Sequence, residues 1–166
     1  MAFEMARVSA RALNPEDYTD VATGCSQLSP MIPELEENIN AGKITGLVAV
    51  YEDTCIGAVL GVLDVNASMA EGPIPLPCIR LLFIEVNARY RGKGVGKLLM
   101  EEFITEQKSR KIASITATLF KNYKAGGNFL EKFGFQKEKT ERNKIIWKLN
   151  LWSDFGVIDM QDEDLS

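Results

Sequence analysis

The residues between Val86 and Lys97 combine backbone freedom with positive charge. The stretch "VNARYRGKGVGK" holds three glycines at alternate positions and four cations: Gly92, Gly94, Gly96, Arg89, Arg91, Lys93 and Lys97. A glycine-rich turn between a strand and a helix aims the free N–H groups of the first helical turn at one point, and the helix dipole adds positive potential there. Such donors suit a phosphate group. The alternative is an ordinary strand-to-helix turn, in which the glycines serve backbone geometry alone.

Two familiar phosphate-binding motifs fail on spacing. A Walker A loop needs a glycine five residues before the glycine of its Gly-Lys pair, and Ser or Thr after the pair. Around Gly96 and Lys97 these places hold Arg91 and Leu98. A Rossmann fingerprint that starts at Gly92 needs glycine or alanine where this chain has Lys97. The loop therefore requires another explanation.

The composition is that of one soluble globular domain. The 166 residues are 46% hydrophobic and 25% charged, which is enough for a single core. The apolar runs are too short to span a membrane and the N-terminus lacks a signal-peptide pattern, which favours the cytoplasm and no membrane partner. A net charge of −4 argues against nucleic acid as a partner, so any basic site must be local. We expect one domain over residues 1–166, with its core at about 5–150 and an acidic, mobile tail at 151–166.

The cysteines indicate neither a disulfide framework nor a metal site. Cys25, Cys55 and Cys78 are odd in number and far apart, and the chain contains no histidine. We therefore expect buried thiols and no bound metal.

Periodicity predicts the elements that must position the loop. Strands are expected before Asn14, over residues 46–65 as a hairpin around "EDT", and over residues 78–86, 113–120 and 143–151. Helices are expected after Asn14-Pro15, over residues 29–42, from Val95 onward, and over residues 122–134. The run "CIRLLFIEV" is almost continuously apolar, as in a central strand that is covered on both faces. The glycine loop follows that strand directly.

Two motifs resemble those of the GNAT acetyltransferase superfamily. Arg91, Gly94 and Gly96 form the pattern Arg-x-x-Gly-x-Gly of its pyrophosphate motif, and "NFLEKFGF" is similar to its downstream helix-to-strand signature. The resemblance covers about residues 5–150. It implies an α+β fold, with a central mixed, mostly antiparallel sheet of about six to seven strands and about four flanking helices. The fourth and fifth strands would be parallel and splayed, and the pantetheine arm of acetyl-CoA would lie between them.

The resemblance also implies coenzyme-binding residues. The loop backbone would hold the pyrophosphate of acetyl-CoA through Arg91, Gly92, Lys93, Gly94, Val95, Gly96 and Lys97. The backbone of Val86 and Asn87 would line the pantetheine arm and the acetyl carbonyl. Asn122 matches a family asparagine near the start of the downstream helix, although it stands one residue farther from the Gly-Phe pair than usual.

The residues that would serve as general base and general acid match the family pattern less well than the coenzyme-binding residues do. Glu85 is the only carboxylate in the strand that leads into the loop, so it is the candidate general base, directly or through water; a salt bridge or a solvated strand end would explain it equally well. Many family members have a tyrosine where this chain has Leu130, and its hydroxyl can protonate the coenzyme thiolate. Tyr123 lies seven residues earlier, about two helical turns away, and is not a simple replacement.

Alternation along the strand before the loop indicates which of its side chains could contact a substrate. Cys78, Arg80, Leu82 and Ile84 share one face of a regular strand, while Glu85 lies on the other. Arg80 either binds a substrate carboxylate or pairs with an acidic neighbour. Cys78 as an acyl-carrying nucleophile is the remote alternative, since no basic partner is visible to ionise it.

The sequence thus favours an acetyl-CoA-dependent N-acetyltransferase that acts on a primary amine of a small molecule or a peptide. The alternative is a non-catalytic acyl-CoA-binding or interaction module, which the leucine at position 130 and the lack of an obvious base would explain. A nucleotide-binding protein is remote after the spacing tests. The sequence leaves the acceptor amine open, and it leaves the oligomeric state open as well, a homodimer included.

Overall fold

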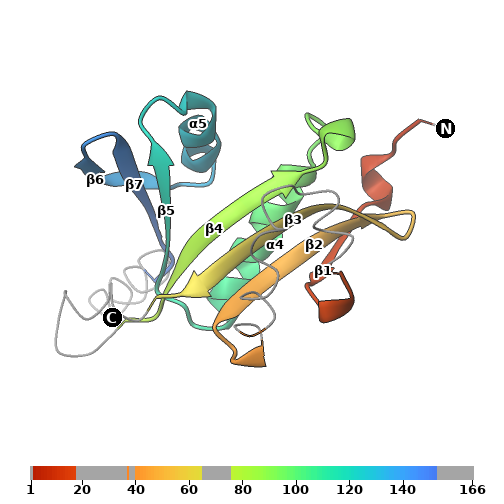
Figure 1. Ribbon diagram of the computed structural model, residues 1–166, viewed down its shortest axis with the longest axis horizontal. Helices are drawn as coiled ribbons and strands as arrows, with labels where there is room; N and C mark the ends of the chain where they lie inside the picture. The colour runs from red at the N-terminus through yellow and green to blue at the C-terminus, as the bar shows by residue number, and fades with distance from the viewer. Residues whose placement is uncertain (1, 18–36, 38–39, 65–75, 153–166) are drawn as a thin grey trace, which may run out of the picture. The chain divides into compact units, whose positions relative to one another are not determined.

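The computed structural model describes residues 2–17, 37, 40–64 and 76–152 (Figure 1). The chain forms two compact units. Unit 1 consists of Met1–Leu63 and Leu82–Glu106, and unit 2 consists of Asp64–Leu81 and Gln107–Ser166. In the described part of the chain, no helix has the length and apolar character needed to cross a membrane.

In the described part of the chain, seven strands form one sheet in the order β1-β2-β3-β4-β5-β7-β6. Their bounds are β1 Ser9–Ala12, β2 Ile44–Tyr51, β3 Thr54–Leu63, β4 Cys78–Val86, β5 Ser114–Phe120, β6 Gln136–Glu141 and β7 Lys144–Asn150. Strands β4 and β5 pair in parallel, while β1-β2, β2-β3, β5-β7 and β6-β7 are antiparallel. This mixed, mostly antiparallel sheet confirms the predicted fold class.

In unit 1, strands β2 and β3 form the predicted hairpin. Tyr51 pairs with Thr54, and the two residues between them, Glu52 and Asp53, have φ of 50° and 64°. Positive φ at both central residues matches the twist of a two-residue hairpin turn. The hairpin contributes to a core cluster that comprises Leu13, Val48, Cys55, Ala58, Leu60 and Phe83.

Helix α4 (Val95–Ser109) packs on β3 in unit 1 (Figure 1). Its apolar residues recur every three or four positions, and the most buried of them are Val95, Leu99, Met100 and Phe103. A Cβ atom at Gly57 of β3 would lie 3.2 Å from Cδ1 of Leu99 and 3.0 Å from the carbonyl oxygen of Glu85. The glycine therefore lets β3 approach both the helix and the end of β4.

A buried carboxylate holds the turn that follows β1. Arg11 donates from Nη1 and Nη2 to Oδ2 and Oδ1 of Asp17 at 2.7 and 2.6 Å, and the Asn14 N–H donates to Oδ2 at 2.8 Å. The Cys55 thiol lies 3.9 Å from Oδ1. Asp17 is only 5% exposed, and the hydrogen bonds from Arg11 lower the pKa of its carboxyl group. We call residues 11–17 the Asp17 turn.

Unit 2 places β5, β7 and β6 beside helix α5 (Lys124–Lys132) (Figure 1). A Cβ atom at Gly127 would lie 2.8 Å from Cζ2 of Trp147, so the helix touches β7 through a position without a side chain. The parallel ladder of β4 and β5 runs from the pair Cys78–Ser114 to the pair Arg80–Thr116. Both strands continue past this ladder, β4 to Val86 and β5 to Phe120.

Several expectations can be compared with these elements. Strand β6 was missed: all its residues are exposed, and its register with β7 shifts between Lys137 and Lys139, so the sequence carries no alternation there. Cys55 and Cys78 are buried free thiols, as predicted, while Cys25 lies outside the described residues.

The described residues contain two α-helices, against about four predicted. Of the segment expected to form a helix after Asn14-Pro15, the described residues show a 3-10 turn at Pro15–Asp17, and the rest lies outside them. Most of the helix expected over residues 29–42, and the acidic tail from residue 153 onward, also fall outside them.

Candidate functional site

The glycine loop begins at an anchored strand end in unit 1. The Asn87 N–H donates to the carbonyl oxygen of Ile56 on β3 at 2.8 Å, which fixes the end of β4. The Asn87 side chain accepts from the Arg89 N–H at 3.0 Å and so caps the 3-10 turn Ala88–Tyr90. The chain then turns through residues 91–94 into α4.

The loop leaves a run of backbone donors open. Leu98 N–H donates to the Gly94 carbonyl at 3.0 Å and begins the helical hydrogen bonding of α4. Within the described residues, the N–H groups of residues 92–97 have no protein acceptor. Gly92 and Gly94 have φ of 74° and 100°; a Cβ atom would meet nothing within 4 Å at Gly92 and only Met5, at 3.9 Å, at Gly94. Open amides at a helix N-terminus are the kind of backbone arrangement that can bind an anion.

Arg91 braces the loop and also contacts the candidate base. Its Nε donates to the Val86 carbonyl at 2.7 Å, and its Nη2 lies 3.6 Å from Oε1 of Glu85. The Glu85 side chain is 15% exposed and the Arg91 side chain is 59% exposed. The salt bridge that the sequence offered as an alternative reason for Glu85 is therefore present.

An aromatic cluster that the sequence did not indicate lies beside the loop. The rings of Phe3, Tyr51 and Tyr90 are 4.8 to 5.9 Å apart between centroids. Lys93 Nζ lies 5.7 Å from the Phe3 ring centroid. Together with Met5, whose side chain lies 3.9 Å from the position that a Cβ atom at Gly94 would take, this cluster places the N-terminal segment beside the loop. The residues are too far apart in the sequence for a local pattern to reveal them.

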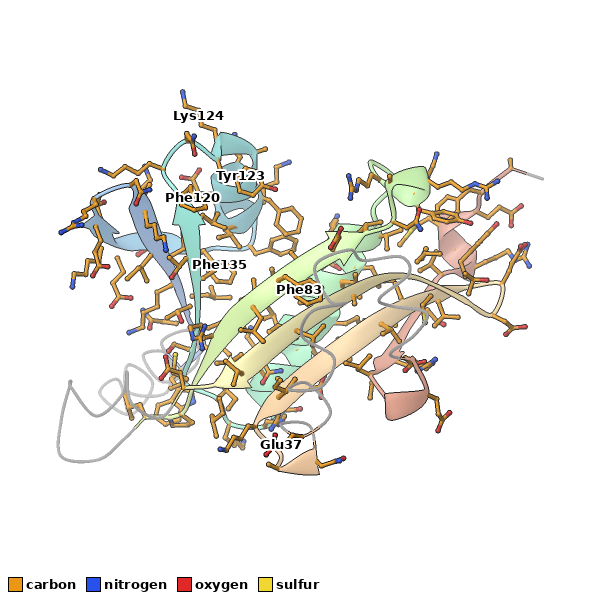
Figure 2. All side chains as sticks on the ribbon, in the orientation of Figure 1. Glu37, Phe83, Phe120, Tyr123, Lys124 and Phe135 are labelled. Atoms are coloured by element: carbon orange, nitrogen blue, oxygen red, sulfur yellow. The ribbon has the colours of Figure 1, made fainter. Side chains whose placement is uncertain are left out.

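The remaining candidates belong to unit 2, and Figure 2 labels one of them, Tyr123. Asn122 is exposed in the turn between β5 and α5, beside Phe120, Lys121 and Arg142. Tyr123 is 56% exposed, with its ring over Gly126. Leu130, at the usual tyrosine position of the family, is 3% exposed and belongs to the core of this unit.

Arg80 and Cys78 border a pocket of about 380 Å³ within unit 2. Arg80 Nε lies 3.9 Å from Oδ2 of Asp64, so the acidic neighbour predicted as one alternative is present. The pocket is lined further by Thr116, Thr118 and Lys148. Cys78 is a buried free thiol, and its Sγ lies 3.8 Å from the carbonyl oxygen of Ile79.

Solved structures share this fold. NAA60 of Arabidopsis thaliana, in complex with acetyl-CoA, is 14% identical with a TM-score of 0.72, over 86% of this chain and 98% of that one. PaiA N-acetyltransferase from Thermoplasma acidophilum, in complex with coenzyme A, is 18% identical with a TM-score of 0.66, over 86% and 98%. Naa50 of A. thaliana, in complex with the bisubstrate analogue CoA-Ac-MVNAL, is 18% identical with a TM-score of 0.67, over 87% and 98%.

The sequence comparisons give a second, independent result. No curated protein matches the sequence. The model of the acetyltransferase (GNAT) family, however, matches residues 11–135, a span that contains the glycine loop and the "NFLEKFGF" motif. Since this span is well over half of the chain and the fold agrees with it, the chain belongs to the GNAT acetyltransferase family.

Proposed function

We propose that the protein is an N-acetyltransferase that binds acetyl-CoA and transfers its acetyl group directly to a primary amine. The observation that carries this proposal is the run of N–H groups at residues 92–97, which lack acceptors within the described residues. A pyrophosphate offers several oxygen atoms to such a run, and the space above Gly92 allows it to approach. Lys93, Lys97 and Arg89 add positive charge around the same backbone.

The end of β4 is well suited to guide the coenzyme arm. Its backbone is held in place, since the Asn87 N–H and the Val86 carbonyl already bond to Ile56 and Arg91. Acetyl-CoA supplies a thioester, whose acetyl group an amine can accept. We assign polarisation of that carbonyl to a backbone N–H near Val86, which needs no particular side chain.

We assign the removal of the amine proton to Glu85, directly or through one water molecule. The Arg91 guanidinium lies 3.6 Å from this carboxylate, at the end of β4 where we place the acetyl group. The protein then needs a proton donor for the coenzyme thiolate. Leu130 cannot supply one, so we assign this step to water.

A second candidate function is a non-catalytic acyl-CoA-binding module. The observation that favours it is Leu130, which is buried where many family members carry a tyrosine. The two functions share the glycine loop and differ only in turnover.

Two measurements on the full-length protein test these functions. Calorimetric titration with coenzyme A measures binding, and release of free thiol from acetyl-CoA measures turnover with a polyamine, an aminoglycoside, an amino acid and a peptide with a free N-terminus. We expect binding, and thiol release that depends on the amine. Absence of coenzyme binding would contradict both functions, while binding without turnover on any amine would favour the module.

A further inference from the structure

The pocket of unit 2 is built on the sheet face that α5 does not cover. Side chains alternate along a strand, and Trp147 of β7 lies against Gly127 of α5. Its neighbours Ile146 and Lys148 therefore point to the opposite face, where they line the pocket. Thr116 and Thr118 of β5 line the same face.

Strand register sets two cations in one row of this face. Arg80 pairs with Thr116 across β4 and β5, and Thr116 pairs with Lys148 across β5 and β7. Neighbouring strands lie about 4.8 Å apart, so the α-carbons of Arg80 and Lys148 are about 10 Å apart. Each cation has an acidic neighbour, since Lys148 Nζ lies 3.9 Å from Oε1 of Glu138 and Arg80 Nε lies 3.9 Å from Oδ2 of Asp64. Among the described residues that line it, the pocket thus presents two charges of each sign.

Both ion pairs are long. Charge-assisted hydrogen bonds in proteins are about 2.7–2.9 Å, and exposed pairs at longer distances add little stability. The Arg80 side chain is 52% exposed, and its contact with Asp64 uses Nε. A ligand carboxylate could therefore bind the guanidinium bidentately, at a shorter distance than Asp64 does.

The charge balance narrows the class of ligand. A polyamine would bring ammonium groups beside Arg80 and Lys148, and a simple carboxylic acid would leave Asp64 and Glu138 without a new partner. An amine that also carries a carboxylate can satisfy both signs. The rim adds apolar surface, since Leu76 and Trp152 are 38% and 37% exposed there. Amino acids with an apolar side chain combine all three properties.

We propose that this pocket binds an amino-carboxylate with an apolar side chain, that Arg80 holds its carboxylate, and that such compounds are the acceptors of the acetyl group. The last part rests on the acetyl transfer proposed above. Arg80 is the third residue of strand β4 (Cys78–Val86), and the same strand precedes the glycine loop in the chain. The carboxylate is thus the feature by which the protein selects its amine.

Three matched compounds test the selection: L-leucine, 3-methylbutylamine, which lacks the carboxylate, and 4-methylpentanoate, which lacks the amine. Thiol release from acetyl-CoA gives kcat and KM for the two amines, and calorimetry gives the affinity of all three. We expect KM for leucine to be at least about tenfold lower than KM for 3-methylbutylamine, about the value of one charge-assisted hydrogen bond. Equal KM values for the two amines would overturn the proposal.

The variants Arg80→Ala and Arg80→Gln assign the effect to one side chain. Both should raise KM for leucine at least about tenfold, leave KM for 3-methylbutylamine unchanged, and leave the affinity for coenzyme A unchanged. Arg110→Ala, which removes an exposed arginine that does not line the pocket, is the matched control and should change none of these values. Because Arg80 is exposed, both variants should fold, which circular dichroism checks.

The outcomes separate this inference from the proposed function. If coenzyme A does not bind, the proposed function fails, and calorimetry with leucine still tests the pocket against Arg80→Ala. If acetyl transfer occurs without preference for the carboxylate, only the pocket assignment fails. Binding of inorganic phosphate that Arg80→Ala abolishes, without binding of leucine, would overturn it too, because the pocket would then be an anion site.

Discussion

Two arginine–carboxylate pairs in unit 1 show how differently the same chemistry can be used. In the Asp17 turn, Arg11 meets both oxygens of Asp17 at 2.6 and 2.7 Å, and a backbone N–H donates to the same carboxylate. In the glycine loop, Arg91 lies 3.6 Å from Glu85, and the neighbouring backbone N–H groups of residues 92–97 have no acceptor within the described residues. The first region satisfies its polar groups internally, and the second leaves the backbone N–H groups of residues 92–97 without an acceptor among the described residues.

This difference predicts which region contributes to the stability of the fold and which contributes to ligand binding. Polar groups that satisfy one another stabilise the fold, because removal of one leaves the others buried without a partner. Backbone N–H groups without a protein acceptor contribute binding free energy only when a ligand is bound. Substitutions in the Asp17 turn should therefore change the free energy of unfolding, and those in the loop should change affinity or turnover.

The largest effect is expected from Asp17→Asn. It removes a buried charge that accepts from Arg11 and Asn14, so the free energy of unfolding should fall by about 3 kcal/mol and Tm by about 10 °C. Because the folded pKa of Asp17 is lowered, its contribution is present above the unfolded pKa and is lost as pH falls through the folded value. Urea unfolding at several pH values should show the difference between wild type and variant shrinking below about pH 4.

Glu16→Gln is the control for Asp17→Asn, since Glu16 is an exposed neighbour in the same 3-10 turn. It should change the free energy of unfolding by less than about 0.5 kcal/mol. If both variants lost the same free energy of unfolding, the buried Arg11–Asp17 pair would not be the cause. The loss would then follow from the removal of any negative charge in this turn.

The second effect concerns the loop backbone. Gly94→Val places a β-branched residue at φ of 100° and should weaken coenzyme A binding by about thirtyfold or more. Arg91→Ala should cost only a few-fold, because the backbone N–H groups carry most of the binding. Gly42→Val, at another glycine with positive φ, is the control for strain and should leave the affinity unchanged. Calorimetry that found Arg91→Ala worse than Gly94→Val would reverse this assignment.

The third effect tests Glu85 as the base. Glu85→Gln should lower kcat by at least about tenfold at neutral pH, and by less at high pH where the free amine is plentiful. Coenzyme affinity and the free energy of unfolding should stay nearly constant, because the 3.6 Å pair with Arg91 is partly exposed. Unaltered rates would show that the carboxylate only positions Arg91. A stability loss as large as that of Asp17→Asn would remove the distinction between the two pairs.

The smallest effect on turnover is expected from Leu130→Tyr. If water supplies the proton to the thiolate, kcat per folded molecule should stay within about twofold of wild type or rise. The larger ring at a position that is 3% exposed should cost about 1–3 kcal/mol of stability. Leu130→Met, which keeps the volume, separates packing from chemistry. A large loss of kcat in both variants would show that Leu130 has a positive role at the site.

Local signals in the sequence predicted much of this fold. The hairpin turn at Glu52 and Asp53, the apolar strand before the loop, and the helix from Val95 follow from turn chemistry and periodicity. The backbone site was predictable for the same reason, since a glycine loop is one continuous segment. Whether those residues bind acetyl-CoA stays a prediction.

Features that depend on distant residues could not be predicted in this way. Phe3, Tyr51 and Tyr90 come together only through the tertiary fold. The row of Arg80 and Lys148 depends on the register of three strands, which no single segment encodes. Asp17 resembles any other acidic residue of a helix start, and only its buried position beside Arg11 distinguishes it.

The exposed strand β6 has a consequence for how the protein behaves at high concentration. It ends the strand order on one side, where a bare edge could recruit the edge strand of another molecule. Its side chains include Lys137, Glu138, Lys139 and Glu141, and its register with β7 is irregular between Lys137 and Lys139. A neighbouring chain that added there would have to desolvate these charges. The same residues that hid β6 from prediction thus protect the sheet against fibre-like growth.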